Sequence, residues 1–181
     1  MIDNIDIFEN FLSVEECDFI LNKCKSELTL SNAEVYGDDI TFRKSSIGRV
    51  DDLGFVNERL TNKLKEVFNI NGMEVTGLGY YQFTKYKEGE YYNWHTDSTD
   101  VVYRDRFTSI VIQLNDTYEG GVLEIKNLKG ELVPIENKIG TLYIFNSRLL
   151  HRVTPVVSGT RYSLVNWVSL VKTDSKKQNL I

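Results

Sequence analysis

From Gly77 onward, short runs of β-forming residues alternate with turn residues, and this alternation constrains the fold more than any other feature of the sequence. Glycine-containing turns separate the runs at Glu119–Gly121, Lys129–Gly130, Lys138–Gly140 and Val157–Gly159. The expected strands are Leu78–Lys85, Tyr91–Thr96, Phe107–Leu114, Val122–Ile125, Glu131–Ile135, Thr141–Phe145, Arg152–Val156 and Arg161–Leu170. Eight short strands at this spacing predict a sandwich or jelly roll.

The part of the chain before these strands carries helical patterns. Ser13 and Glu16 have the spacing of a capping box, in which each side chain accepts a hydrogen bond from the other residue's backbone. Apolar residues follow at helical spacing as far as Leu28, and a second apolar stripe predicts a helix over Leu53–Phe68. Residues 29–51 are polar and are compatible with one or two strands and a loop. Both helices are expected to pack on one sheet of the β region.

The length and composition indicate one folded core. The chain has 181 residues, of which 41% are hydrophobic and 12% aromatic. We therefore expect a single domain over 1–181, with a helical support region over 1–76 and a β core over 77–171. The polar last stretch, Lys172–Ile181, is expected to fray.

The charge and the cysteines bound the partners and the compartment. A net charge of −5 and a pI of about 5.1 argue against nucleic acid or an anionic membrane as a partner. No apolar run approaches the roughly 20 residues that cross a bilayer, and the N-terminus lacks the features of a signal peptide. Cys17 and Cys24 would lie about 10 Å apart along a helix, too far for a disulfide, and fit core residues in a reducing compartment. The sequence thus predicts a cytoplasmic monomer or homodimer.

The only two histidines, His95 and His151, form the first candidate site together with Asp97. On a strand, positions i and i+2 point to the same face, so the His95 imidazole and the Asp97 carboxylate converge. His151 begins another expected strand. Two imidazoles and one carboxylate leave one side of an octahedral metal open, which suits a non-haem Fe(II) oxygenase. Taken singly, the same residues fit a surface pair and a structural histidine.

A basic residue extends this candidate site. Arg161 lies ten residues after the second histidine on the next expected strand, so a turn would bring both into one cavity. Ser163 points to the same face, and a guanidinium with a hydroxyl can bind a carboxylate. Trp167 shares this face and would either line the cavity or fill the core. Tyr86, on the same face of its own strand as Gln82, can donate to a bound carboxylate. A surface arginine on an edge strand is the simpler alternative for Arg161.

Several motifs occur in one order with characteristic spacings. They are Gln82-x-x-x-Tyr86-x-x-Gly89-x-x-Tyr92-x-x-His95-x-Asp97, Leu114-Asn115 followed by Gly120-Gly121-x-Leu123, Gly140-x-Leu142 through Phe145, and His151 with Arg161. In this set the chain resembles the prolyl 4-hydroxylase branch of the 2-oxoglutarate oxygenases. The Phe-Leu-Ser start of the first helix and Arg43-x-Ser45 are also similar. The resemblance covers nearly the whole chain and is strongest over residues 80–170.

The resemblance implies a fold and a set of site residues. The fold would be mainly β, a double-stranded β-helix (a cupin-like jelly roll) with the N-terminal helices packed on the major sheet. Three residues would hold Fe(II), namely His95, Asp97 and His151, and Arg161 would pair with the distal carboxylate of 2-oxoglutarate. The other residues implied for the cosubstrate pocket are Tyr86, Gln113, Ser163 and Trp167. Those implied for the substrate are Arg106 and Gln82.

The chain differs from many relatives at two positions. Arg161 stands where many collagen-type members have Lys, and Arg is typical of oxygen-sensing prolyl hydroxylases and of lysyl hydroxylases. Gln113 stands where several relatives carry a Tyr that touches the cosubstrate. The Gln113 amide can still donate a hydrogen bond.

The resemblance also implies an activity. Fe(II), 2-oxoglutarate and O2 would hydroxylate a protein or peptide, with peptidyl proline the leading target, succinate and CO2 the products and ascorbate a supporting reductant. Other targets are peptidyl lysine, a small molecule or an alkylated base, and the acidic charge balance argues against nucleic acid. A non-catalytic jelly-roll binding module and a zinc hydrolase are alternatives that Arg161 disfavours. The loop Ser98–Asp105 is either a lid over the substrate or a solvated connection.

Overall fold

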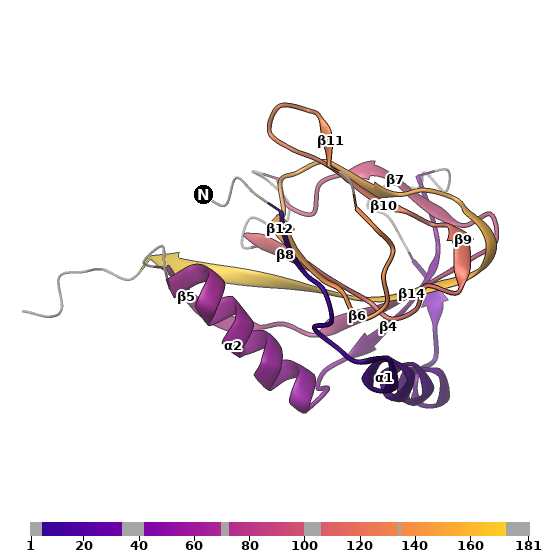
Figure 1. Ribbon diagram of the computed structural model, residues 1–181, viewed down its shortest axis with the longest axis horizontal. Coiled ribbons are helices and arrows are strands. Elements are labelled where there is room, and N and C mark those ends of the chain that lie inside the picture. Colours follow the sequence, from indigo (N-terminus) through magenta and orange to yellow (C-terminus); the bar gives the residue numbers. More distant parts are fainter. Residues whose placement is uncertain (1–4, 34–41, 70–72, 100–105, 134, 173–181) are drawn as a thin grey trace, which may run out of the picture.

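Two antiparallel sheets face each other, and two helices cover the outer side of the larger one (Figure 1). The structure is a computed structural model that describes residues 5–33, 42–69, 73–99, 106–133 and 135–172. The small sheet lies on the side of the large sheet that faces away from the helices. This mainly β arrangement is the jelly roll that the sequence predicts.

The nine-stranded sheet is built around one long strand, β14 (Val156–Lys172), which pairs with four others. Its strand order is β1 (Asp6–Phe8), β12 (Leu142–Asn146), β8 (Thr108–Gln113), β14, β6 (Tyr81–Lys87), β4 (Ser46–Val50) and β2 (Ser31–Asn32). Two further strands pair with β14 outside this order, β5 (Met73–Leu78) and β9 (Tyr118–Gly120). The five-stranded sheet has the order β11 (Leu132–Val133), β10 (Leu123–Lys126), β13 (His151–Val153), β7 (Tyr91–His95) and β3 (Arg43–Lys44).

Both predicted helices are present and pack on the large sheet. Helix α1 spans Val14–Glu27 and starts with the predicted capping box, in which the Glu16 amide donates to Ser13 Oγ at 3.2 Å and the Ser13 amide donates to Glu16 Oε2 at 2.9 Å. Helix α2 spans Phe55–Asn69. One buried cluster joins the apolar sides of both helices to the outer face of the sheet. Its members include Cys17, Ile20, Leu21, Cys24, Val56, Leu60, Leu64, Phe68, Tyr81, Phe83, Ile110, Ile112, Leu164 and Val168.

The predicted turn at Val157–Gly159 is wrong. Thr154 and Pro155 separate β13 from β14 without reversing the chain, and Val157–Gly159 belong to β14. Gly159 has a φ of 80°, and the pairing of β14 with β9 shifts register between Val156 and Ser158. Gly159 therefore lies at an irregularity within a strand and not in a turn. Pairing with β9 continues the strand through this irregularity.

The region before Gly77 contributes strands as well as helices. Besides α1 and α2 it holds β1, β2, β3, β4 and most of β5, which extend the edges of both sheets. Residue 134 within the expected strand Glu131–Ile135 lies outside the described residues, as does the stretch 173–181 that was expected to fray. Neither helix in the described part of the chain has the length and apolarity to cross a membrane.

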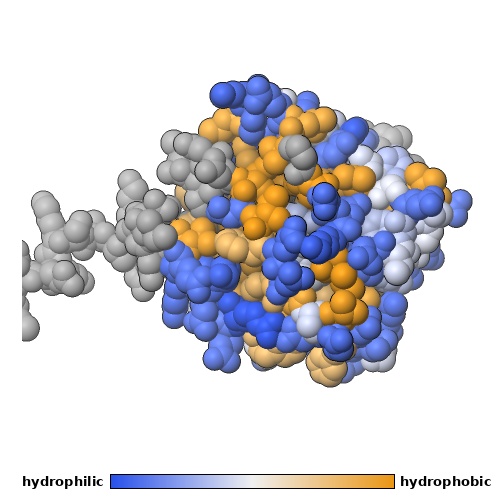
Figure 2. All heavy atoms as spheres, in the orientation of Figure 1, coloured by the Kyte–Doolittle hydropathy of each residue, from blue (hydrophilic) through white to orange (hydrophobic). Residues whose placement is uncertain are grey.

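Apolar side chains are concentrated between the helices and the sheet but are not confined there. Figure 2 shows patches of hydrophobic residues among hydrophilic ones on the face seen in Figure 1. Single exposed apolar side chains of this kind are normal for a folded domain. Cys17 and Cys24 are buried and free, as the sequence predicts for core thiols.

We expect Gly140→Ala to destabilise the protein more than Gly130→Ala. Both glycines have positive φ angles, 73° and 81°, so an alanine at either site incurs the backbone penalty of about 1–2 kcal/mol. A Cβ at Gly140 would also lie 2.0 Å from the Leu12 carbonyl oxygen, whereas one at Gly130 would meet no atom within 4 Å. Urea denaturation should show the free energy of unfolding falling by about 3 kcal/mol or more for Gly140→Ala. Equal losses in the two variants would contradict the packing interpretation.

Candidate metal and anion site

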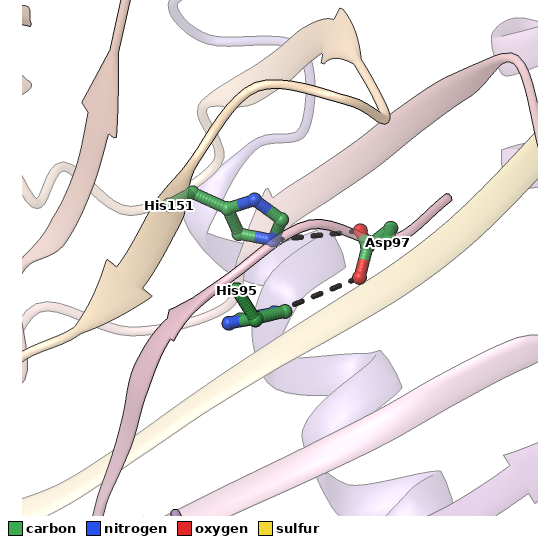
Figure 3. Close-up of side chains that lie close together, drawn as sticks. All are labelled: His95, Asp97 and His151. Carbon is green, nitrogen blue, oxygen red and sulfur yellow. Dashed lines mark ion pairs between the residues drawn. The ribbon is translucent and has the colours of Figure 1, made fainter. Parts of the chain in front are cut away.

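Two histidines and an aspartate lie close together where the neighbouring strands β7 and β13 of the small sheet pair (Figure 3). His95 ends β7 and lies directly opposite His151, the first residue of the neighbouring strand β13. Asp97 follows β7 and faces both rings, with Oδ1 3.6 Å from His95 Nε2 and Oδ2 3.5 Å from His151 Nε2. One ligand atom from each of the three residues lies within 4.8 Å of the others, so they could hold one metal ion.

Backbone carbonyl groups set the orientation of both imidazole rings. His95 Nδ1 lies 2.7 Å from the Asn93 carbonyl oxygen, and His151 Nδ1 lies 2.9 Å from the Leu149 carbonyl oxygen. In a neutral ring the Nδ1–H donates to such a carbonyl, which leaves the Nε2 lone pair available. In each case the carbonyl belongs to the residue two positions earlier. Both Nε2 atoms therefore face Asp97 as unprotonated ligands would.

Two serines hold Asp97 in place. Ser109 Oγ, on the second residue of β8, donates to Asp97 Oδ2 at 2.6 Å and lies 2.8 Å from Ser147 Oγ. The Asp97 amide donates to the Ser147 carbonyl oxygen at 2.8 Å. Sequence reasoning missed both serines. No local signal marks them, since Ser109 follows another hydroxyl residue, Thr108, and Ser147 lies between the polar residues Asn146 and Arg148.

The electrostatics of the cluster favour a deprotonated carboxylate beside two imidazoles. Burial raises the pKa of Asp97, but the adjacent His151 and His95 outweigh it and hold that pKa well below its usual range. Burial lowers the pKa of His95, and the neighbouring His151 lowers it further. Burial also opposes charge on His151, yet the Asp97 carboxylate raises the pKa of His151 overall. A carboxylate oxygen and two ring nitrogens with free lone pairs fit a divalent first-row metal such as Fe(II).

Arg161 carries a buried positive charge in the same region. It is only 1% exposed, and its Nη1 donates to Ser163 Oγ while its Nη2 donates to Gln113 Oε1, each at 2.9 Å. No carboxylate of the described residues lies within ion-pair distance of Arg161. The Arg161 Nε has no hydrogen-bond partner among the described residues either. A permanently charged group left in this way can bind an anion.

One cavity of about 560 Å³ joins the metal-ligand cluster to Arg161. Its volume is in the range of small-molecule sites. Among the residues predicted for the site, those that line the cavity are His95, Asp97, His151, Arg161, Ser163, Tyr86, Trp167, Arg106 and Gln82. Gln113 is not among the lining residues and lies behind the guanidinium that it contacts.

Aromatic side chains form much of the cavity wall. Tyr92 stacks on the His95 ring with centroids 3.5 Å apart, and this tyrosine is a contact that sequence reasoning did not assign to the site. The Arg106 guanidinium lies 3.8 Å from the centroid of the Trp167 ring. Tyr86, which is 3% exposed, lies under the Arg161 guanidinium at 5.5 Å. Tyr86 and Trp167 both line the cavity, as their positions on the strand faces predict.

The loop expected over the cavity is only partly described. Ser98 is buried, its amide donates to the Ser147 carbonyl oxygen at 3.1 Å, and Thr99 lines the cavity. Residues 100–105 lie outside the described residues. The lid and the solvated connection both stay predictions.

Comparisons with known proteins agree with this geometry. Residues 81–169 match the model of the 2OG-Fe(II) oxygenase superfamily. A PKHD-type hydroxylase of Shewanella sp. strain ANA-3 is 31% identical over 105 residues, which are 55% of this chain and 46% of the relative. The chain thus spans about half the length of the curated relatives that it matches.

Two solved structures share the fold. A Pseudomonas putida prolyl-4-hydroxylase has a TM-score of 0.71 at 23% identity, with 91% of each chain covered. A Trichoplax adhaerens prolyl hydroxylase, in complex with a hypoxia inducible factor oxygen degradation domain peptide fragment, has a TM-score of 0.75 at 21% identity, covering 93% of this chain and 84% of that one.

Residues 81–169 thus belong to the 2OG-Fe(II) oxygenase superfamily, and the chain shares the jelly-roll fold of the two prolyl hydroxylases. Fe(II), 2-oxoglutarate and O2 are the cofactors that fit this family, and the donor set and the unpaired Arg161 fit the first two.

We expect Ser109→Ala to weaken metal binding about tenfold, because outer-shell groups that orient a ligand typically contribute 10–100-fold to metal affinity. The variant removes the hydroxyl that donates to Asp97 Oδ2. Titration of Mn(II), as a redox-stable substitute for Fe(II), would measure the affinity. Ser26→Ala on α1 is the control, since Ser26 Oγ donates only to the Lys23 carbonyl oxygen on the helix surface. Equal affinities in the two variants would contradict a role for Ser109.

Proposed function

We propose that this chain is an Fe(II)- and 2-oxoglutarate-dependent dioxygenase that hydroxylates a protein or peptide substrate, with peptidyl proline as the target. In this proposal His95, Asp97 and His151 hold the iron, and Arg161 binds the distal carboxylate of 2-oxoglutarate. The products from the cosubstrate are succinate and CO2.

One observation carries the proposal: a buried guanidinium with no counterion among the residues that the structure describes shares a cavity with a metal-ligand set of two histidines and an aspartate. The metal-ligand set alone would also suit a zinc hydrolase. Metal-assisted hydrolysis by itself does not require a permanent positive charge in the cavity, and such a buried charge is costly unless an anion pairs with it. A dicarboxylate that chelates the metal through one end and meets Arg161 through the other would use both features.

The protein's own groups bind, orient and shield. Arg161 and the Ser163 hydroxyl hold the distal carboxylate, and the strand positions of both fix where the other end of the molecule can reach. The aromatic wall of Tyr92 and Trp167 keeps water from the reacting region. When bound, the iron and 2-oxoglutarate supply O2 activation and the oxidative decarboxylation that provides one oxygen atom for the substrate.

The support for a prolyl substrate is less direct. The cavity contains aromatic rings from Phe42, Tyr80, Tyr92 and Trp167, which suit a compact apolar ring. Both structural neighbours described above are named as prolyl hydroxylases, and one of them holds a peptide. Peptidyl lysine and a small molecule are the alternative substrates. A non-catalytic binding module is the alternative function.

Arg161→Met should separate cosubstrate binding from metal binding. Methionine preserves apolar bulk and removes a buried charge, so the fold should tolerate the change. Loss of two charge-assisted hydrogen bonds, at about 1.5 kcal/mol each or more, predicts at least about a hundredfold weaker binding of 2-oxoglutarate. Anaerobic calorimetry with Mn(II)-loaded protein would measure the affinity, and Mn(II) binding itself should be unchanged.

His95→Ala is the companion variant. This variant should bind Mn(II) more weakly than wild type does. It should therefore also lose the part of the 2-oxoglutarate affinity that depends on the metal. If wild type binds Mn(II) but gains no affinity for 2-oxoglutarate, or if Arg161→Met binds 2-oxoglutarate as tightly as wild type does, the cosubstrate assignment is wrong.

Peptide assays would test the substrate. Iron-loaded protein with 2-oxoglutarate and O2 should release succinate and add one oxygen atom to proline-containing peptides, as detected by mass spectrometry. Lysine-containing peptides without proline are the matched comparison, and Asp97→Ala is the inactive control. Oxygen gain in the lysine peptides alone would reassign the substrate while leaving the cofactor assignment intact.

A further inference from the structure

Arg161 is held in place by neutral groups alone. Its Nη1 donates to Ser163 Oγ and its Nη2 donates to Gln113 Oε1, both at 2.9 Å. Ser163 lies on the same strand face as Arg161, two residues along β14, whereas Gln113 belongs to the adjacent strand β8. A side-chain amide accepts a hydrogen bond without neutralising the cation. The guanidinium is thus fixed on two sides while its charge stays available to a ligand.

The orientation of the Gln113 amide decides whether this arrangement holds. The amide can face two ways, and only one presents its oxygen to Arg161. Gln113 Nε2 donates to the Asn115 carbonyl oxygen at 2.7 Å, to the Tyr118 hydroxyl at 2.8 Å and, at 3.4 Å, to the Tyr162 carbonyl oxygen. Three acceptors therefore hold the NH2 group away from Arg161. With the amide reversed, NH2 would face a guanidinium that has only donors.

Tyr118 reaches Gln113 from a different part of the fold. It begins β9, which pairs with the first part of β14, and Tyr118 lies opposite Gly159. The glycine after β9 makes room for the contact. A Cβ on Gly121 would lie 3.1 Å from Tyr118 Cε2 and 3.2 Å from Arg161 Cδ, and Gly121 has a φ of 55°. The side chains of Tyr118 and Arg161 thus both lie against Gly121, where a Cβ would crowd them.

The phenol of Tyr118 stays protonated in this environment. Burial raises the pKa of Tyr118, and the neighbouring Arg161 guanidinium only partly opposes that rise. The neutral phenol oxygen can then accept the Gln113 hydrogen bond while adding no negative charge beside Arg161. A carboxylate in the same place would pair with the guanidinium and compete with a ligand anion.

We propose that Tyr118 is a positioning residue for cosubstrate binding: through Gln113 it fixes the Arg161 guanidinium in the orientation that receives the distal carboxylate of 2-oxoglutarate. This inference rests on the proposed function of Arg161. Tyr118 acts on affinity and does not touch the reacting atoms.

Tyr118→Phe tests the proposal by removing one oxygen atom. Gln113 then loses its only side-chain acceptor among the described residues and keeps the two backbone acceptors, the carbonyl oxygens of Asn115 and Tyr162. We expect the dissociation constant of 2-oxoglutarate for Mn(II)-loaded protein to rise about tenfold, equivalent to about 1.4 kcal/mol. Calorimetry would measure this constant and the Mn(II) affinity, which should stay within about twofold of wild type. If hydroxylation is observed, the KM for 2-oxoglutarate should rise while kcat changes little.

Tyr162→Phe is the matched control. Tyr162 adjoins Arg161 on β14 but faces the helices, where its ring stacks on Phe83. It should bind 2-oxoglutarate as wild type does. A second variant, Gln113→Glu, should bind 2-oxoglutarate more weakly than Tyr118→Phe, because a glutamate would pair with Arg161 directly.

The possible outcomes separate the two proposals. If wild type does not bind 2-oxoglutarate, the proposed function fails and Tyr118 has nothing to position. If wild type binds it and Tyr118→Phe matches Tyr162→Phe, the role of Tyr118 is wrong while the function stands. If Tyr118→Phe also loses Mn(II) affinity, the change has disturbed the whole site, and a positioning role is likewise contradicted.

Discussion

The cost of burying Arg161 is the constraint on which the site depends. A guanidinium is charged at every accessible pH, so it cannot escape burial by losing its proton. Here it is 1% exposed, and within the described part of the chain its hydrogen-bond partners are the neutral side chains of Ser163 and Gln113. The fold supports this charge with hydrogen bonds that leave it unneutralised. The cavity is consequently prepared for an anion, and its other end holds ligands for a cation.

The two faces of the long strand β14 have different roles: one face lines the cavity and the other packs into the core beneath the helices. Residues 161, 163, 165 and 167 line the cavity, whereas Tyr162, Leu164 and Val168 belong to the core beneath the helices. This alternation is the ordinary period of a β-strand. It means that substitutions on one face change the affinity for ligands, while substitutions on the other change stability. A slip of one residue in register would exchange the two sets and destroy both properties.

Sequence reasoning succeeded where the signal was local or periodic. The Ser13–Glu16 cap, the apolar stripes of both helices, and the i, i+2 relation of His95 and Asp97 need only neighbouring residues. It failed where a partner distant in sequence decides the outcome. The glycine at 159 signals a turn locally, but pairing with β9 keeps it inside a strand. Ser109 and Tyr118 gain their roles from residues on other strands, and nothing in the flanking sequence of either residue names those partners.

The two ends of the cavity are built on different principles. At the metal end, backbone carbonyls orient both histidines, so the position of the rings follows from the pairing of β7 with β13, and the Ser109 hydroxyl holds the Asp97 carboxylate beside them. At the anion end, the side chains of Ser163 and Gln113 orient the guanidinium, and Tyr118 in turn holds the Gln113 amide. A change in one of these side chains can therefore alter the anion end without altering the strand pairing that sets the histidines at the metal end.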